Sequence, residues 1–386
     1  MTHTLTINLA SIAHNWRTLN TQLASGVDCG AVVKADAYGL GMDKVIPALY
    51  FSGCRSFYVA NLDEALQTQS VLQSTSNNAL GSSAVGNSKI IVLSGCAPGE
   101  EQDFIENSII PVIVSEPMLQ RWLQATRQKK AVAALKINTG MGRLGLELEE
   151  FLRLFEEPGL LTCAGIEVLM SHLACADEPG HPLNGQQLQR FSQALSQIQK
   201  IDPAVRGCLA NSSGICLGPE YHFDAVRPGI GLYGGFSQME DLGVALQEVV
   251  SLHLPVVQTR NLPAGESVGY GATRHFSQTA KLAIVAGGYA DGLFRSLSNR
   301  GASWVADPNG EGGWLAPIVG RISMDTTIVD ISAVPEGVVH EGARLEFIGP
   351  HLSVENIAKA AGTVSYEVLT SLGARYNRHY LAGEIS

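Results

Sequence analysis

A lysine that follows a short apolar run is the first candidate for chemistry in this chain. Residues 31–41 read Ala-Val-Val-Lys-Ala-Asp-Ala-Tyr-Gly-Leu-Gly, so Lys34 ends a strand-like segment and Tyr38 lies four residues later. Burying an ammonium group is costly unless it is paired. Desolvation also lowers the pKa of a lysine and frees its amine to attack a carbonyl carbon. The alternative is a lysine whose stem lies along the strand end while its charge reaches water.

Residues 212–230 contain the elements of a phosphate site. Ser212 offers a hydroxyl group, and Gly229 and Ile230 offer backbone N–H groups at the start of a predicted short helix. A phosphate is electrostatically favoured at such a position, and barrels often bind phosphate after their last strands. The alternative is that Arg227 and the following Pro-Gly form a simple turn.

The first 235 residues alternate short β-rich runs with longer amphipathic stretches such as 9–23 and 184–200. Repeated βα units predict a parallel sheet, and eight of them predict a closed (β/α)8 TIM barrel. An open doubly wound sheet is the alternative, but no Gly-x-Gly-x-x-Gly motif opens the first helix. The expected strands are 30–35, 56–60, 89–94, 109–114, 133–138, 164–170, 207–211 and 224–227.

Polar side chains follow several of these strands. Because functional side chains of a barrel lie at the carboxyl ends of its strands, we expect them to share one rim with Lys34. They are Asn138, Thr139, His172, Asn211, Ser212 and Arg227. No second histidine or cysteine lies at ligand spacing from His172, so we expect no metal site.

The pattern changes after Gly234-Gly235, where long crossover helices give way to strands and turns. We therefore expect a barrel domain over residues 1–240 and a mainly β domain over 241–386. Residues 74–88, rich in Ser, Asn, Gly and Ala, are expected to form a surface loop. The expected elements of the second domain are strands 246–260, 267–274, 280–287, 315–320 and 326–332 and a helix near 353–361.

The composition favours a soluble, cytoplasmic protein. The 386 residues carry 26 basic and 36 acidic side chains, a net charge of −10, which argues against a nucleic-acid partner. The seven cysteines are scattered without a Cys-x-x-Cys pair, as in a reducing compartment. We see no secretory signal and no apolar run of membrane-spanning length, so no membrane partner is expected.

The segment around Lys34 closely resembles the cofactor-lysine motif of alanine racemases, two-domain enzymes that use pyridoxal 5'-phosphate (PLP). Motifs of this family recur in order along nearly the whole chain, which makes the resemblance specific. They begin at Asn138 (NTGMGRLG), Ser171 (SHLA), Ala210 (ANSS), Arg227 (RPGIGLY), Gly269 (GYGA), Gly287 (GGYADG), Gly320 (GRISMD) and Ser365 (SYEVLT).

The resemblance implies a PLP-dependent racemase that interconverts L- and D-alanine and supplies D-alanine for peptidoglycan. Inverting a stereocentre needs one acid–base group on each face of the carbon. The resemblance assigns Lys34 to one face and Tyr270 to the other. In the family this tyrosine reaches the site from the partner subunit, which implies a homodimer with shared active sites. Because a free tyrosine has a pKa of about 10, Tyr270 needs positive charge nearby, and His172 and Arg227 are the candidates to supply it. For His172 the alternative is a neutral, buried imidazole that hydrogen-bonds a neighbour.

The resemblance also assigns the remaining site residues. Arg227 faces the pyridine nitrogen and keeps its proton, although a structural ion pair is the alternative. Lys136 matches a lysine that is often carbamylated, with a plain carboxylate contact as the alternative. His172 and Asn211 border the cofactor. The residues implied to bind the PLP phosphate are Tyr38, Ser212, Gly229, Ile230 and Tyr366, and those implied to bind substrate are Arg143, Tyr289, Met324 and Asp325.

Three rival functions remain. A racemase for serine or a broader set of small amino acids is one, because pocket size discriminates only about 1–3 kcal/mol per methylene. A PLP decarboxylase is disfavoured, since it would need an acidic partner for the pyridine nitrogen where this chain has Arg227. A non-catalytic PLP carrier would resemble the barrel alone, whereas this chain also has a second domain and Tyr270.

Overall fold

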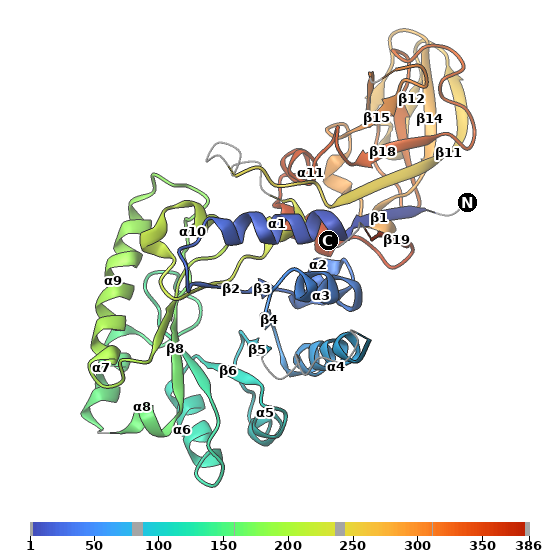
Figure 1. Ribbon diagram of the computed structural model, residues 1–386. Coiled ribbons are helices and arrows are strands. Elements are labelled where there is room, and N and C mark those ends of the chain that lie inside the picture. The colour runs from blue at the N-terminus through green and yellow to red at the C-terminus, as the bar shows by residue number, and fades with distance from the viewer. Residues whose placement is uncertain (1–2, 79–87, 158, 236–243, 311, 383–386) are drawn as a thin grey trace.

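The computed structural model describes residues 3–78, 88–157, 159–235, 244–310 and 312–382. Figure 1 shows two parts, a parallel sheet surrounded by helices and a mainly β part that lies beyond one side of it. This arrangement agrees with the predicted fold class, a barrel followed by a mainly β domain.

Nine parallel strands form the barrel sheet among the described residues. The first strand, predicted over 30–35, instead spans 28–32 and is split at Gly30. The half before Gly30 pairs with β10 and the half after it with β4, which joins the two edges of the sheet. A side chain at Gly30 would collide with the Tyr58 ring, so glycine allows this close approach. The strands are β2 (Asp28–Cys29), β3 (Ala31–Val32), β4 (Ser56–Val59), β5 (Lys89–Val92), β6 (Ile110–Ile113), β7 (Ala133–Lys136), β8 (Ile166–Met170), β9 (Arg206–Cys208) and β10 (Ala225–Val226).

Amphipathic helices cover the outside of this sheet. In the first of them, Ile12, Trp16 and Leu19 are buried against the barrel, as the period of apolar residues predicts. The helices are α1 (Leu9–Thr21), α3 (Met42–Phe51), α4 (Leu62–Asn78), α5 (Glu101–Asn107), α6 (Glu116–Ala125), α7 (Leu148–Arg153), α8 (Leu160–Cys163), α9 (Pro182–Gln199) and α10 (Ser212–Cys216).

The predicted surface loop 74–88 is wrong over its first residues. Residues 74–78 form the last turn of α4, where serine hydroxyls donate to carbonyls of the preceding turn: Ser74 bonds Ser70 and Thr75 bonds Val71. Such local bonds let Ser and Thr remain in a helix. Residues 79–87 of that prediction lie outside the described residues.

The second sheet begins with the N-terminus of the chain. β1 (Thr4–Asn8), which the sequence analysis missed, pairs antiparallel with β11 (Val250–Leu262) and parallel with β19 (Asn377–Leu381). Asn8 then caps α1 by accepting a hydrogen bond from the Ser11 N–H, so the chain enters the barrel directly from the second sheet (Figure 1). The predicted domain boundary at residue 240 lies outside the described residues.

The remaining elements of the second part follow the predicted order with additions. The predicted strand 267–274 is instead a hairpin of β12 and β13 interrupted at Tyr270, because Gly269 and Gly271 have positive φ and break the extended backbone. The predicted helix near 353–361 is confirmed. The elements are β12 (Ser267–Val268), β13 (Arg274–His275), β14 (Ala280–Ala286), β15 (Ala302–Ala306), β16 (Gly313–Pro317), β17 (Thr326–Asp330), β18 (Arg344–Ile348), α11 (Val354–Ala361) and α12 (Ser365–Thr370).

Lys34 begins a left-handed turn, α2 (Lys34–Gly39), where the sequence predicted a strand to residue 35. The strand ends at Val32, and the four residues from Ala35 to Tyr38 have φ between 52° and 58°. Left-handed backbone costs roughly 1–2 kcal/mol per non-glycine residue, so this turn must be held by its surroundings.

Several hydrogen bonds hold the turn. The Met42 N–H donates to Asp36 Oδ1 at 2.7 Å, and the Ala37 N–H donates to the Val33 carbonyl at 2.9 Å. From β19, the Tyr380 hydroxyl donates to the Leu40 carbonyl at 3.0 Å. The second part therefore helps to fix the backbone that carries Lys34.

Replacing Ala35 by glycine should leave the free energy of unfolding unchanged or raise it by up to about 1 kcal/mol. Glycine removes the left-handed penalty, which offsets its larger entropy when unfolded. The matched control is Ala10→Gly in the right-handed helix α1, which should lower stability by about 1 kcal/mol. Denaturant unfolding measures both, and equal destabilisation by the two variants would contradict the strained turn.

Candidate active site

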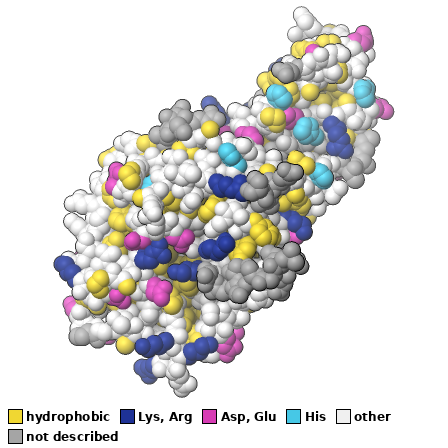
Figure 2. Space-filling view, viewed as in Figure 1, with side chains coloured by type: hydrophobic (Ala, Val, Ile, Leu, Met, Phe, Trp, Pro, Cys, Tyr) yellow, Lys and Arg dark blue, Asp and Glu magenta, His cyan; other side chains and the backbone are white. Residues whose placement is uncertain are grey.

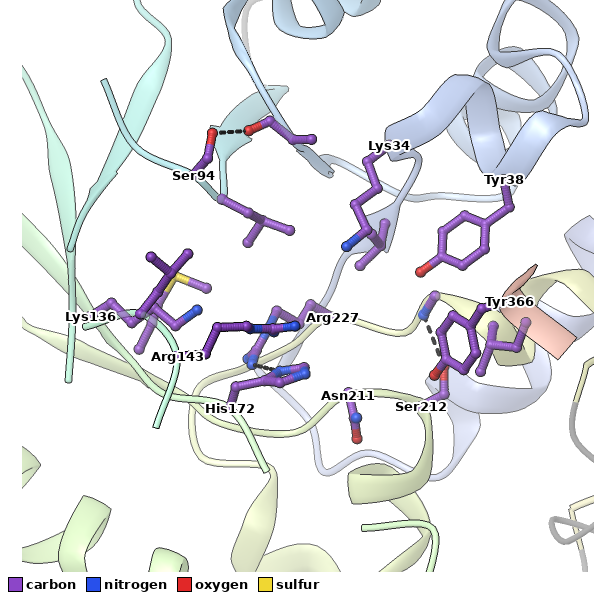
Figure 3. A pocket seen from close by; sticks show the side chains of 17 residues that line it. Lys34, Tyr38, Ser94, Lys136, Arg143, His172, Asn211, Ser212, Arg227 and Tyr366 are labelled. Carbon is purple, nitrogen blue, oxygen red and sulfur yellow. Dashed lines mark hydrogen bonds between the residues drawn. The ribbon is translucent and has the colours of Figure 1, made fainter. Parts of the chain in front are cut away.

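A cavity of about 520 Å³ opens at the carboxyl ends of the barrel strands. This volume is in the range of small-molecule sites. Figure 3 shows its charged and phenolic side chains pointing toward a common space. The lining residues are Val32, Lys34, Tyr38, Ala60, Leu93, Ser94, Lys136, Arg143, Leu144, Met170, His172, Asn211, Ser212, Arg227, Gly229, Ile230 and Tyr366.

The cavity brings together eleven of the residues selected from the sequence and leaves out others. Asn138 and Thr139, expected on the same rim, do not line it. The Asn138 carboxamide oxygen instead accepts the N–H groups of Gly140 and Gly142, and the Thr139 hydroxyl contacts that of Ser171 at 2.7 Å. Both residues shape the loop that carries Arg143.

Four cationic side chains, Lys34, Lys136, Arg143 and Arg227, line this cavity, and none of its described lining residues is acidic. Burial, followed by the charge of Arg143, lowers the pKa of Lys34, and burial, followed by the charges of Arg227 and Arg143, lowers the pKa of Lys136 to about 8. On the face in Figure 2, by contrast, coloured Lys and Arg side chains are interspersed with Asp and Glu. The cavity therefore concentrates positive charge for an anionic ligand, and its lysines are poised to be neutral nucleophiles.

Arg227 is held in place by backbone and side-chain acceptors. Its Nη1 donates to the Cys208 carbonyl at 3.3 Å and contacts the Cys208 sulfur at 3.4 Å. Its Nη2 donates to the Ser171 carbonyl and to His172 Nδ1, the latter at 2.9 Å. The sequence analysis missed Ser171 and Cys208, because a small residue beside an arginine carries no signal until the strands are paired.

His172 is neutral in this setting. Burial, followed by the charge of Arg227, lowers its pKa to about 2. The expectation that His172 supplies positive charge to a phenol is therefore wrong, since a buried imidazole among four cations does not take up a proton. Arg227 is the remaining candidate for that role.

Ser212, Gly229 and Tyr38 form a donor-rich end of the cavity. Ser212 Oγ accepts the N–H groups of Gly229 at 2.9 Å and Gly231 at 3.1 Å, so its own proton is free to be donated. A Cβ at Gly229 would collide with the Tyr38 hydroxyl. Glycine at this position therefore keeps the backbone close to the phenol.

Two phenols line the same end from different parts of the chain. Burial raises the pKa of Tyr38 well above its usual value and that of Tyr366 to about 12, so both keep their protons and act as donors. Their ring centroids lie 5.9 Å apart. Tyr366 belongs to α12, so the second part also contributes to this cavity.

Four predicted residues lie outside the cavity. Tyr270, Tyr289 and Met324 are 70%, 44% and 52% exposed. Asp325 forms an ion pair with Arg375 at 2.7 Å. The hairpin that carries Tyr270 lies in the mainly β part, away from the barrel strands (Figure 1).

Two further findings concern the rest of the described chain. Across those residues, no cluster of three or more His, Cys, Asp or Glu side chains could hold a metal ion. Within the same ranges, no helix is both long and apolar enough to cross a membrane.

The pKa of His172 predicts a pH dependence of stability. Below about pH 6.5 the unfolded chain binds a proton at this residue and the folded chain does not, so falling pH favours unfolding. His172→Asn keeps an acceptor for Arg227 but does not titrate. Between pH 6 and 4.5 the wild type should lose roughly 1–2 kcal/mol more unfolding free energy than the variant. Denaturant titrations measure the unfolding free energy of both proteins at each pH. An equal dependence on pH in the wild type and the variant would contradict a neutral His172.

Comparisons with known proteins agree with the geometry. Residues 7–237 match the model of the alanine racemase N-terminal domain and residues 249–380 that of the C-terminal domain. The alanine racemase of Rhodospirillum rubrum is 44% identical over 97% of this chain and 95% of that protein. A catabolic alanine racemase of Agrobacterium fabrum is 44% identical over 98% of this chain and 92% of that protein. The crystal structure of the Bartonella henselae alanine racemase, with covalently bound pyridoxal phosphate, has a TM-score of 0.86 and 37% identity over 99% of this chain and all of that chain. With both family models matched over most of its length, the chain belongs to the alanine racemase family.

Proposed function

We propose that this protein is a PLP-dependent alanine racemase that interconverts L- and D-alanine. The observation that carries the proposal is the cavity itself. It joins a lysine amine of lowered pKa to a donor-rich end suited to a phosphate, and Arg227 lines the same space beside His172.

The residues present fit PLP. The cofactor carries a phosphate and a phenolic oxygen, and the polar side chains among the described lining residues are cationic or hydrogen-bond donors and include no acid. Ser212 Oγ, Tyr38, Tyr366 and the N–H group of Ile230 would hold the phosphate, and Gly229, whose N–H donates to Ser212 Oγ, would allow the backbone to approach it. The Ser212 hydroxyl oxygen already accepts two N–H groups. Its O–H group is therefore available to donate to an anion.

When bound, PLP supplies an electron sink that makes the α-proton of an amino acid removable. Lys34 would bind the cofactor covalently, and once released by substrate its amine would move the α-proton on one face. Its lowered pKa favours the neutral amine, which is the form that accepts that proton. Arg227 would be the partner of the pyridine nitrogen and would retain its own proton. Because it gives up no proton, it would limit how much charge the ring withdraws and so disfavour loss of other groups from the substrate.

The second face of the substrate carbon needs another acid–base group, and Tyr270 from a second copy of the chain fills this role. Tyr270 is 70% exposed and lies outside its own chain's cavity, as do Tyr289 and Met324. Large apolar groups that are exposed together are typical of an interaction surface. A homodimer would bury them and complete each cavity with residues of the other subunit.

Substrate recognition follows from the remaining charges. Arg143 binds the carboxylate of the amino acid from the barrel side, and Met324 and Asp325 face it from the second subunit. Lys136, with a pKa of about 8, is partly neutral near pH 7 and can therefore react with carbon dioxide. The resulting carbamate would place one negative charge beside Arg143 and fix its guanidinium. The product D-alanine then enters peptidoglycan synthesis in the cytoplasm.

Optical inversion of a panel of L-amino acids, with and without added PLP, tests the function. We expect racemisation of alanine to dominate, and Lys34→Ala to abolish both activity and the visible absorbance of the bound cofactor. If serine or a larger amino acid is racemised faster than alanine, that amino acid and not alanine is the substrate. Undiminished cofactor colour in Lys34→Ala would refute the covalent role of the lysine.

Mixing two inactive variants tests the shared sites. Lys34→Ala and Tyr270→Phe each disable one base, so a mixed dimer has one cavity with both bases intact. After subunit exchange we expect recovery of roughly one quarter of wild-type activity, because half of the dimers are mixed and each contains one complete site. Each variant incubated alone is the control, and no recovery despite proven exchange would rule out the partner's contribution.

A further inference from the structure

The carboxylate of Glu64 joins two segments that border the cavity. Its Oε1 accepts the N–H of Ala35 at 2.8 Å, and its Oε2 accepts the N–H of Ala60 at 2.7 Å. Ala35 directly follows Lys34, and Ala60 lines the cavity at the end of β4. One side chain therefore ties the backbone of the reactive lysine to the barrel wall.

The segment held by Glu64 is the strained one. Ala35 is the first of the four left-handed residues after Lys34, with φ of 53°. Because such backbone persists only where neighbouring groups over-determine it, the bond at Ala35 fixes the direction in which the lysine leaves the strand. The opposite side of Ala60 is held as well, since the Ser94 hydroxyl donates to its carbonyl (Figure 3).

Glu64 is itself positioned by the start of α4. Its N–H donates to Asn61 Oδ1 at 3.0 Å, which caps the helix. A carboxylate in the first turn is stabilised by the helix dipole. Charge-assisted hydrogen bonds of this kind are roughly twice as strong as neutral ones.

The charge of Glu64 also acts on the lysine amine. The groups that face Lys34 are Arg143, Arg227 and Lys136, all cationic, and Glu64, the carboxylate whose field raises the pKa of Lys34 against them. The nearer carboxylate in sequence, Asp36, is bound instead to the Met42 N–H. The negative charge of Glu64 thus partly offsets, at the Lys34 amine, the effect of the surrounding cations.

We propose that Glu64 is a positioning residue for Lys34, which aims the amine into the cavity through its two backbone contacts and tunes its proton affinity through its charge. This inference rests on the proposed covalent role of Lys34, and it adds a residue that touches neither cofactor nor substrate.

Covalent attachment of PLP tests both halves of the proposal. Full-length protein freed of PLP is mixed with PLP from pH 6 to 10, and the adduct at Lys34 is trapped with borohydride and quantified by peptide mass spectrometry. The plateau rate at high pH reports positioning, and the inflection reports the proton affinity of the amine. The ionisable groups of PLP titrate in the same way with every variant, so they do not affect the differences between variants.

Three variants separate the two effects. Glu64→Gln removes the charge, and we expect the plateau to fall about tenfold and the inflection to move down by about half a pH unit. Glu64→Asp keeps the charge on a shorter arm, so its plateau should fall while its inflection stays closer to the wild type. Asp63→Asn removes an exposed charge one residue away and should change neither quantity. Circular dichroism establishes that each variant is folded.

The outcomes distinguish this inference from the proposed function. An unchanged inflection in Glu64→Gln, or an equal response of Asp63→Asn, would overturn the role of Glu64. If the wild type itself forms no adduct at Lys34, the covalent role of the lysine fails first, whatever the variants do.

Discussion

The cavity at the carboxyl ends of the barrel strands is organised around unbalanced positive charge. Lys34, Lys136, Arg143 and Arg227 face one space whose described lining residues include no acid. Bringing such groups together is unfavourable until an anion joins them, so the apoprotein is built for a negatively charged occupant. Burial, and after it the same imbalance, lowers the pKa of both lysines and keeps His172 neutral. The charges that favour an anionic ligand therefore add to the effect of burial on the nucleophile.

The scaffold supplies the stiffness that this charge arrangement requires. Most of the charged groups lie at or just after strand ends, and Arg227 is fixed by carbonyls of two neighbouring segments, at Ser171 and Cys208. Lys34 differs because it begins a left-handed turn, whose backbone conformation is unfavourable for the non-glycine residues that form it. Contacts from α4 and β19 hold that turn. Site precision thus depends on elements distant in sequence from the lysine.

The sequence was sufficient to predict the barrel and its parallel strands, because strand periodicity is a local signal. Polar residues at strand ends pointed to Lys34, His172, Asn211, Ser212 and Arg227, whereas Tyr38, Lys136, Arg143 and Tyr366 came from the family resemblance. It was insufficient where the cause is non-local. β1 pairs with strands about 245 and 375 residues later, and nothing in Thr4–Asn8 distinguishes it from a barrel strand. The left-handed turn was missed since alanine and aspartate normally favour other conformations, and only the surrounding hydrogen bonds select this one.

The position of Tyr270 is the reason for proposing that two chains complete one site. Its hairpin extends the phenol outward between Gly269 and Gly271, whose positive φ values turn the backbone sharply on each side of the ring. An exposed phenol held by so short a loop gains nothing for the stability of its own subunit, and a tyrosine in water is a poor base. Both features become useful when a cationic cavity such as the one around Arg227 receives the ring, because nearby positive charge lowers the pKa of a phenol. In the proposed homodimer, the strained turn and the charges of one subunit and the exposed acid–base group of the other would be complementary parts of a single site.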